Sequence, residues 1–168
     1  LLAGTDIYRF QHSHPDETLA SMERATRLVC LHDFVHRAIP DRFAEKLRVI
    51  IQSALPLDMP RQPPEDRFEI CVIGHLREEK DPLRAAYAAR LAPESSRLHV
   101  TNLGRAHTPE WENAATAEVA SNPRFQWRGE VGGDEVRRQY AQSHAMVISS
   151  IMEGGANVVS EAIVAGLP

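Results

Sequence analysis

The sequence predicts an α/β fold made of doubly wound parallel sheets, in which helices cover both faces of each sheet. Short runs rich in Val, Ile and Leu alternate along the chain with segments of helical character. The run over 68–74, FEICVIG, is mostly apolar, which is typical of a strand that is buried on both faces of a sheet. A proline-rich segment, residues 54–67, separates two such series.

The first series, residues 1–53, reads as β-α-β-α-β. The start of the chain is apolar and turns polar at Gly4-Thr5-Asp6, which indicates a strand end leading into a loop. The remaining elements are expected as a helix over 16–24 capped by Asp16, a strand over 27–31, a helix over 33–46 broken at Pro40, and a strand over 47–52.

Residues 54–67 hold four prolines, and neither a helix nor a central strand accommodates that density. We interpret this segment as a linker between two domains.

The second series, residues 68–168, repeats the alternation. Pro82 suits a first helical turn, Asp134 opens a later helix, and Gly166 ends the last one. If the strands follow the order 3-2-1-4-5-6, the fourth strand of this series lies at an exposed edge. The strands are expected over 68–74, 97–103, 125–128 and 145–150, and the helices over 82–91, 109–120, 134–143 and 157–165.

Charge and composition narrow the class of partner. The formal net charge is −4, which does not favour a nucleic acid or an anionic membrane. No apolar run is long enough for a transmembrane segment. Two cysteines are too few for a disulfide scaffold and fit a reducing compartment, so we expect a cytoplasmic protein.

The loop after the strand 68–74 carries cations. Gly74 allows a ligand to approach the backbone, and His75, Arg77 and Lys80 follow before a helix begins. Cationic side chains beside a helix N-terminus suit a phosphate or a diphosphate. The alternative is a solvated loop in which neighbouring glutamates pair with the bases.

The loop after the strand 145–150 carries carboxylates and glycines. It runs Glu153-Gly154-Gly155-Ala156-Asn157 and leads to Glu161 on the first turns of the next helix. Glycine amides can face an anion or a sugar oxygen, and ionised carboxylates accept hydrogen bonds from hydroxyl groups. The alternative is a helix capped by Asn157 with incidental glutamates.

The second loop, continued to Gly166-Leu167-Pro168, resembles the signature of the family 4 glycosyltransferases of GT-B fold: a Glu, seven residues, a Glu, then Gly-x-Pro. The loop that carries Lys80 is similar to the family's diphosphate loop. The resemblance covers residues 68–168 well and 1–53 more weakly. It implies two Rossmann-like domains, with 1–53 the end of an N-terminal acceptor domain and 68–168 part of a C-terminal nucleotide-sugar domain. The chain is then truncated at both ends, and we expect this piece alone to be inactive.

The resemblance also implies roles for individual residues. Lys80 and Arg77 neutralise the departing diphosphate, Glu153 contacts sugar hydroxyls, and Glu161 holds the ribose. Backbone amides of Gly155, Ala156 and Asn157 surround the sugar and phosphate, with Gly154 beside them. The nucleotide sugar, expected to be UDP-linked, is a co-substrate, and neither a cofactor nor a metal is implied. His75 stands where the family usually has arginine, so Arg77 is expected to supply the missing cation.

A narrower resemblance concerns the acceptor. Gly74-His75-Leu76-Arg77, Gly154-Gly155-Ala156-Asn157 and Gly4-Thr5-Asp6 are similar to the selenosugar synthases, which join selenium from selenophosphate to a sugar. The acceptor is then a small anion rather than a glycan, and Gly4-Thr5-Asp6 borders its site. The alternatives are a non-catalytic nucleotide-sugar-binding module and a GT-B epimerase or phosphorylase.

Other chemistry-bearing residues favour structural roles. His32 and His36 have a spacing that can bind a metal, but no third ligand follows at a recognisable spacing. The glycines within 129–133 lack the spacing of a dinucleotide-binding loop. Cys30 and Cys71 lie in expected strands and are interpreted as core thiols.

Overall fold

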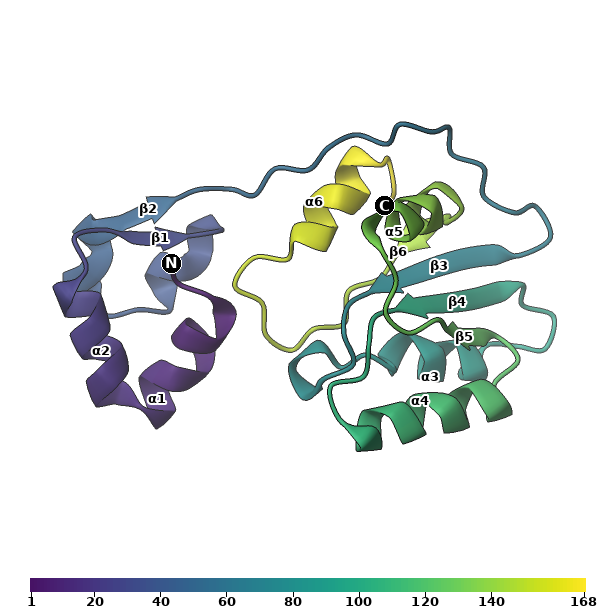
Figure 1. Ribbon diagram of the computed structural model, residues 1–168, viewed down its shortest axis with the longest axis horizontal. Helices are drawn as coiled ribbons and strands as arrows, with labels where there is room; N and C mark the ends of the chain where they lie inside the picture. Colours follow the sequence, from purple (N-terminus) through teal and green to yellow (C-terminus); the bar gives the residue numbers. More distant parts are fainter. The chain divides into compact units, whose positions relative to one another are not determined.

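The computed structural model describes residues 1–168, which form two compact units (Figure 1). One unit comprises Leu1–Ser53 together with Met152–Asn157. The other comprises Ala54–Ile151 together with Val158–Pro168. The loop that contains Glu153 is thus grouped with the first unit, although its neighbours in sequence belong to the second.

The first unit is built on two short parallel strands, β1 (Leu28–Cys30) and β2 (Leu47–Val49). Leu2 extends this pairing on the other side of β1, because its N–H donates to the carbonyl of Val29 at 2.8 Å. Helix α2 (Pro15–Arg24) follows the short helix α1 (Gln11–Ser13). The buried core of this unit includes Ile7, Met22, Val35 and Phe43.

Three expectations for this unit are wrong in whole or in part. Gly4-Thr5-Asp6 is not a loop: Asp6–Phe10 forms a π-helix that begins after a helical Thr5, and the Asp6 carboxylate accepts the N–H of Ala3 at 3.0 Å. The break expected at Pro40 is confirmed, but the segments on either side of it, Asp33–Arg37 and Asp41–Lys46, are 3-10 helices rather than α-helix. Helix α2 begins at Pro15 and has no side-chain cap, so Asp16 lies within its first turn.

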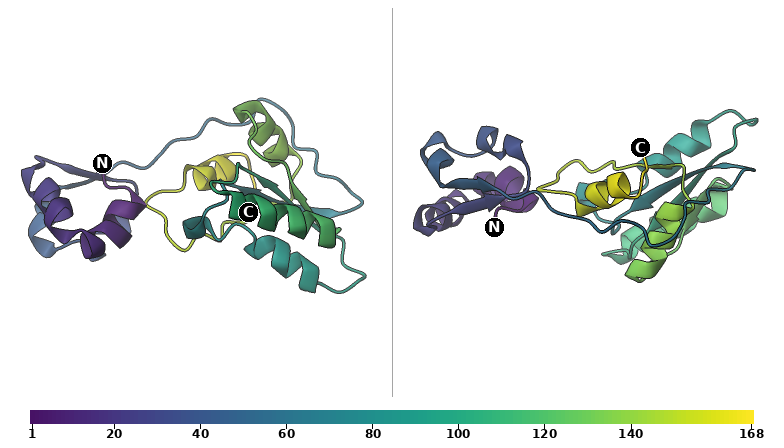
Figure 2. Two further views of the ribbon diagram at one scale, coloured as in Figure 1. Left: turned by 60° about the horizontal axis from the view of Figure 1, so that its bottom comes forward. Right: turned by 90° about the horizontal axis from the view of Figure 1, so that it is seen from above.

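The second unit contains a four-stranded parallel sheet in the order β5-β4-β3-β6 (Figures 1 and 2). Numbered within this unit, that order is 3-2-1-4, which confirms the expected topology. Successive strands placed on both sides of β3 require crossover connections, and the helices supply them. The strands are β3 (Phe68–Ile73), β4 (Leu98–Leu103), β5 (Phe125–Trp127) and β6 (Ala145–Met146), and the helices are α3 (Arg84–Leu91), α4 (Pro109–Ser121), α5 (Gly133–Ala141) and α6 (Asn157–Val164).

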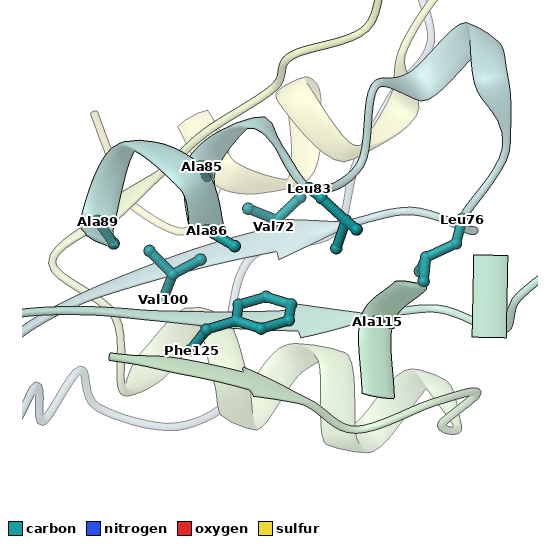
Figure 3. Packing of buried hydrophobic residues seen from close by; sticks show 9 residues of the cluster. All are labelled: Val72, Leu76, Leu83, Ala85, Ala86, Ala89, Val100, Ala115 and Phe125. Atoms are coloured by element: carbon teal, nitrogen blue, oxygen red, sulfur yellow. The ribbon is translucent and has the colours of Figure 1, made fainter. Parts of the chain in front are cut away.

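Side chains on one face of this sheet pack against α3 and α4 (Figure 3). Val72, Val100 and Phe125 come from three adjacent strands, and small alanines of the helices allow close approach. Trp111 and Trp127 pack at the margin of this cluster. The remaining members of the cluster are Leu76, Leu83, Ala85, Ala86, Ala89 and Ala115.

The opposite face of the sheet is covered by α5 and α6, which bury Cys71 and Tyr140. Helix α6 ends in a Schellman motif: Leu167 N–H donates to Ala162 O, Gly166 N–H donates to Ile163 O, and Gly166 has φ +75°. The termination expected at Gly166 is confirmed. Helix α5 begins at Gly133 after Gly132, and no side chain caps it, so the expected role of Asp134 is wrong.

Strand β6 is shorter than the expected 145–150. Met146 N–H donates to Pro168 O on its outer side, and Val147 N–H donates to Cys71 O on its inner side. Beyond Val147 the chain leaves the sheet to bind the loop that follows β3, as described below. The edge strand is therefore both short and partly paired. No helix of the protein is long and apolar enough to cross a membrane.

Candidate functional site

The carboxyl ends of β3 and β4 open into a cavity of about 360 Å³. Doubly wound sheets bind ligands at this edge, in the crevice between the loops that follow the carboxyl ends of the strands. The predicted residues Gly74, His75, Arg77 and Lys80 all line this cavity. The other lining residues are Ile73, Leu103, Gly104, Glu130, Val131, Val136 and Val158.

Close approach of two glycines shapes the wall of the cavity. Gly104 directly follows β4 and has φ +150°, and a Cβ there would collide with the carbonyl oxygen of Gly74 and lie 2.8 Å from the nitrogen of His75. The indole of Trp127 donates to the carbonyl oxygen of Gly104 at 2.8 Å, which fixes this turn from the next strand. Only glycine fits at position 104 without moving the loop that begins at Gly74.

His75 is held as a neutral hydrogen-bonding group. Its Nδ1 accepts the backbone N–H of Arg105 at 3.2 Å, so the proton of the neutral ring resides on Nε2. Burial lowers the pKa of His75, and the nearby charges of His107, Arg105 and Arg77 lower it further. The expectation that Arg77 supplies the cation of this loop is consistent with a neutral His75, since both residues line the cavity.

Lys80 lies at the end of a short 3-10 helix, Glu78–Lys80, and the chain then turns at Asp81. Asp81 is the one non-glycine residue with positive φ, at +43°. Its carboxylate accepts Nε–H of Arg84 at 2.7 Å, which ties the turn to the start of α3. Helix α3 begins at Arg84 rather than at Pro82, because this turn occupies the intervening residues.

Glu161 lies on α6 in the second unit and contacts Tyr140. The phenol of Tyr140 donates to Oε2 of Glu161 at 3.1 Å and lies 3.4 Å from the carbonyl oxygen of Val158. Tyr140 is only 2% exposed, and burial together with the Glu161 carboxylate raises the pKa of its hydroxyl. A neutral tyrosine therefore donates to Glu161 throughout the physiological pH range.

The loop that begins at Glu153 packs within the first unit. A Cβ on Gly4 would lie 2.6 Å from the nitrogen of Gly154, and a Cβ on Gly154 would collide with Gly4 in turn. Gly155 has φ +154° and lies against the side chain of Leu31. The structure thus brings Gly4, proposed from sequence to border the acceptor, against Gly154 of the predicted sugar loop. Thr5 continues the helical turn, and Ala156 and Asn157 follow in the same segment.

Seven of the lining residues are not among the site residues predicted from the sequence: Ile73, Leu103, Gly104, Glu130, Val131, Val136 and Val158. The glycines within 129–133 lack the spacing of a dinucleotide-binding loop, and that test alone does not point to Glu130 or Val131. Their position immediately after β5 was the signal that could have found Glu130 and Val131, because β5 ends at the same edge of the sheet.

The remaining polar groups hold the fold. Glu69, buried on β3, accepts hydrogen bonds from Arg67 Nε at 2.7 Å, His99 Nδ1 at 3.0 Å and the hydroxyl of Thr101. Burial tends to raise the pKa of Glu69, but these three donors outweigh it and hold the pKa below its usual value. The carboxylate stays ionised and links the start of β3 to β4.

The two histidines singled out from the sequence make local backbone contacts, and the two cysteines lie in the core. His32 Nδ1 accepts the N–H of Phe34 at 3.2 Å, and His36 Nδ1 lies 2.6 Å from the carbonyl oxygen of Asp33. No group of three or more His, Cys, Asp or Glu side chains is placed to hold a metal ion. Cys30 and Cys71 are buried and not in a disulfide.

The model of the family described as glycosyl transferases group 1 matches residues 58–168. The chain belongs to this family. The match spans the four-stranded sheet, the cavity at its carboxyl edge and the glutamate-containing loop. No match to a curated protein sequence was found.

Solved structures support the same fold. The chain is similar to HepE of Anabaena bound to UDP-glucose, with a TM-score of 0.77 and 15% identity over 98% of this chain and 50% of HepE. It is similar to a TarM variant of S. aureus bound to UDP, with a TM-score of 0.74 and 12% identity over 99% of this chain and 35% of TarM.

A third similar structure is WaaG, a glycosyltransferase involved in lipopolysaccharide biosynthesis. Its TM-score is 0.66 and its identity 19%, over 96% of this chain and 50% of WaaG. The chain therefore spans half or less of the length of these structures. The expected fold class, an α/β protein with parallel sheets of GT-B type, is confirmed.

Proposed function

We propose that this chain forms the donor-binding part of a glycosyltransferase that transfers a sugar from a nucleotide-diphosphate sugar, UDP-linked, to an acceptor. One observation carries the proposal: Arg77, Lys80 and the neutral His75 line a single cavity at the carboxyl edge of a parallel sheet. Val158, on the first turn of α6, lines the same cavity. A helix N-terminus and two cations suit a diphosphate.

The chemistry follows from charge. Departure of the diphosphate leaves positive charge at the anomeric carbon and places negative charge on the leaving oxygens. Lys80 and Arg77 are cationic at physiological pH and stabilise those oxygens without moving a proton. His75 can donate its Nε2–H but adds no charge, because its pKa is lowered. In this proposal the reaction needs no metal ion, since these side chains supply the positive charge.

The roles of the two glutamates rest on the signature. In this proposal Glu153 contacts sugar hydroxyls, with Gly154 and the backbone amides of Gly155, Ala156 and Asn157 around the sugar and phosphate. Glu161 accepts hydrogen bonds from the ribose. The hydrogen bond from Tyr140 supports that role, since it orients the carboxylate of Glu161.

The acceptor is proposed on the narrower likeness of the motifs to selenosugar synthases. Selenium of selenophosphate attacks the anomeric carbon, a carbon–selenium bond forms, and the carbon–oxygen bond to UDP breaks. The residues proposed to border this acceptor are Gly4, Thr5 and Asp6. Buried, unpaired Cys30 and Cys71 support a reducing compartment such as the cytoplasm.

The test compares UDP binding and donor turnover in the full-length protein with those of Lys80→Ala. We expect Lys80→Ala to lower turnover roughly 100-fold and UDP affinity about 10-fold, and to leave uridine affinity unchanged. Lys46→Ala, which removes the only other lysine, is the matched control. Equal turnover in both variants would reject the assignment of Lys80.

Product analysis separates the alternatives. UDP-sugar binding without consumption indicates a non-catalytic binding module, and epimerised or phosphorylated sugar indicates an isomerase or a phosphorylase of the same fold. Selenophosphate is tested against glycan acceptors with the same donor. A product that contains no selenium rejects the narrower proposal and leaves the donor site intact.

A further inference from the structure

Two segments of the second unit that are distant in sequence are hydrogen-bonded beside the cavity. The hydroxyl of Ser149 lies 2.8 Å from the carbonyl oxygen of Asp81 and 3.2 Å from that of Lys80. The N–H of Ile151 donates to the carbonyl oxygen of Glu79 at 2.9 Å. The loop that carries Lys80 is thus fastened at three successive carbonyls to residues 149–151.

The fastening coincides with the unusual backbone of this loop. Asp81 has φ +43° and ψ +55°, a left-handed conformation that non-glycine residues adopt only when their surroundings hold them there. The carboxylate of Asp81 is held by Arg84, and its carbonyl is held by Ser149. Without the Ser149 hydroxyl, this turn loses the donor that engages the carbonyls of Lys80 and Asp81.

We propose that Ser149 is a positioning residue that holds the loop so that Lys80 faces the donor diphosphate. A lysine side chain has a flexible stem of four carbons, so its charge reaches a fixed point only if its backbone is fixed. Ser149 fixes that backbone through its hydrogen bonds to the carbonyls of Lys80 and Asp81. The inference rests on the proposed function, because it assigns a task to Lys80 at that site.

The central test is a double-mutant cycle on UDP affinity in the full-length protein, using Ser149→Ala and Lys80→Ala. We expect Ser149→Ala to weaken UDP binding about 3- to 10-fold and to leave uridine binding unchanged. The double variant is expected to bind UDP no more weakly than Lys80→Ala alone. Fully additive losses, or an equal loss for uridine, would overturn the inference.

Two further variants separate positioning from general destabilisation. Ser121→Ala removes a hydroxyl that also donates to a backbone carbonyl, Ala117 O at 2.9 Å on α4, and is expected to leave UDP affinity unchanged. Ser149→Thr keeps the hydroxyl and is expected to restore UDP affinity to within about 2-fold of the wild type. Failure of Ser149→Thr to restore more than Ser149→Ala would count against the hydroxyl.

Failure of the proposed function gives a different result. If the wild-type protein binds no UDP, or Lys80→Ala leaves UDP affinity intact, the diphosphate role of Lys80 is rejected. Hydrogen exchange then still examines the loop, because the N–H groups of Lys80 and Asp81 are bonded to Arg77 O and Glu78 O. Ser149→Ala is expected to speed their exchange, and unchanged exchange would show that Ser149 holds nothing.

Discussion

Replacement of Gly104 by alanine is the sharpest test of how the cavity is built. Gly104→Ala places a methyl group against the carbonyl oxygen of Gly74 and 2.8 Å from the nitrogen of His75. Both contacts are closer than the 3.0 Å that real Cβ atoms respect, and both partners are backbone atoms that cannot rotate away. The loop that starts at Gly74 must therefore move, and the wall of the cavity that it forms moves with it.

The cost has two parts. Holding a non-glycine residue at φ +150° costs about 1–3 kcal/mol. Forcing atoms into a filled space costs about 1–3 kcal/mol more. A sum of about 2–6 kcal/mol corresponds to a fall in melting temperature of roughly 10–30 °C for a unit of this size. We also expect UDP affinity to fall, measured below the lowered melting transition.

Two other glycines provide controls of the same chemical change. Gly129 has φ +66°, but no atom lies within 4 Å of the place that an added methyl group would take, so Gly129→Ala is expected to cost only the conformational strain of about 1–2 kcal/mol. Gly133 begins α5 in open space, and Gly133→Ala is expected to stabilise the protein by up to about 1 kcal/mol. If Gly104→Ala melts and binds UDP like Gly133→Ala, the crowding argument is refuted.

Three other predictions concern buried groups. Glu69→Gln should lower the free energy of unfolding by about 1–3 kcal/mol at pH 7. Because the pKa of Glu69 is lowered in the folded state, its contribution is present above pH ~4.5 and is lost as the pH falls through the folded-state pKa. The melting temperatures of the wild type and the variant, measured from pH 3 to 7, should therefore converge at the acid end. Tyr140→Phe should weaken binding of uridine by about 3- to 10-fold through Glu161, whereas binding of inorganic diphosphate, measured by calorimetry, should not change. Burial raises the pKa of Cys71 to about 11, so the protein should lose about 2–3 kcal/mol of stability as the pH rises from about 9 to 11, and Cys71→Ala should abolish that loss in alkaline urea titrations.

The sheet of the second unit was predictable because its signals are local and repeated. Strand β3 is a short, mostly apolar run, and β4 and β5 begin with apolar residues at alternate positions. Helices α3 to α6 begin within two residues of their predicted starts. The order 3-2-1-4 was predictable only from the usual strand order of doubly wound sheets, because right-handed crossovers alone allow several orders. The cationic loop was predictable for the same reason: glycine and cations stand directly after the first strand.

Features set by distant partners were not predictable. Strand β6 ends early because Ser149 and Ile151 bind the loop around Lys80, nearly seventy residues away in sequence. The neutral state of His75 depends on Arg105 and His107, and the need for glycine at 104 depends on Gly74. Residues 4–6 became helical instead of forming a loop, and there the Asp6 carboxylate satisfies the N–H of Ala3.

Unusual backbone conformations gather near the cavity at the carboxyl edge of the second unit's sheet. Gly104 follows β4 directly, Gly129 lies two residues after β5, and Asp81 lies in the loop after β3. Residues within a strand are held at extended φ values. At the carboxyl edge of the sheet, the chain must therefore turn within the few residues that follow each strand. At two of these turns glycine removes the steric cost. At the third, an aspartate persists because Arg84 holds its side chain and Ser149 its carbonyl, and the residue it fixes is the neighbour of Lys80. The strained turn at Asp81 therefore belongs to the candidate diphosphate site, and the residues that hold it, Arg84 and Ser149, are not part of the glycosyltransferase signature.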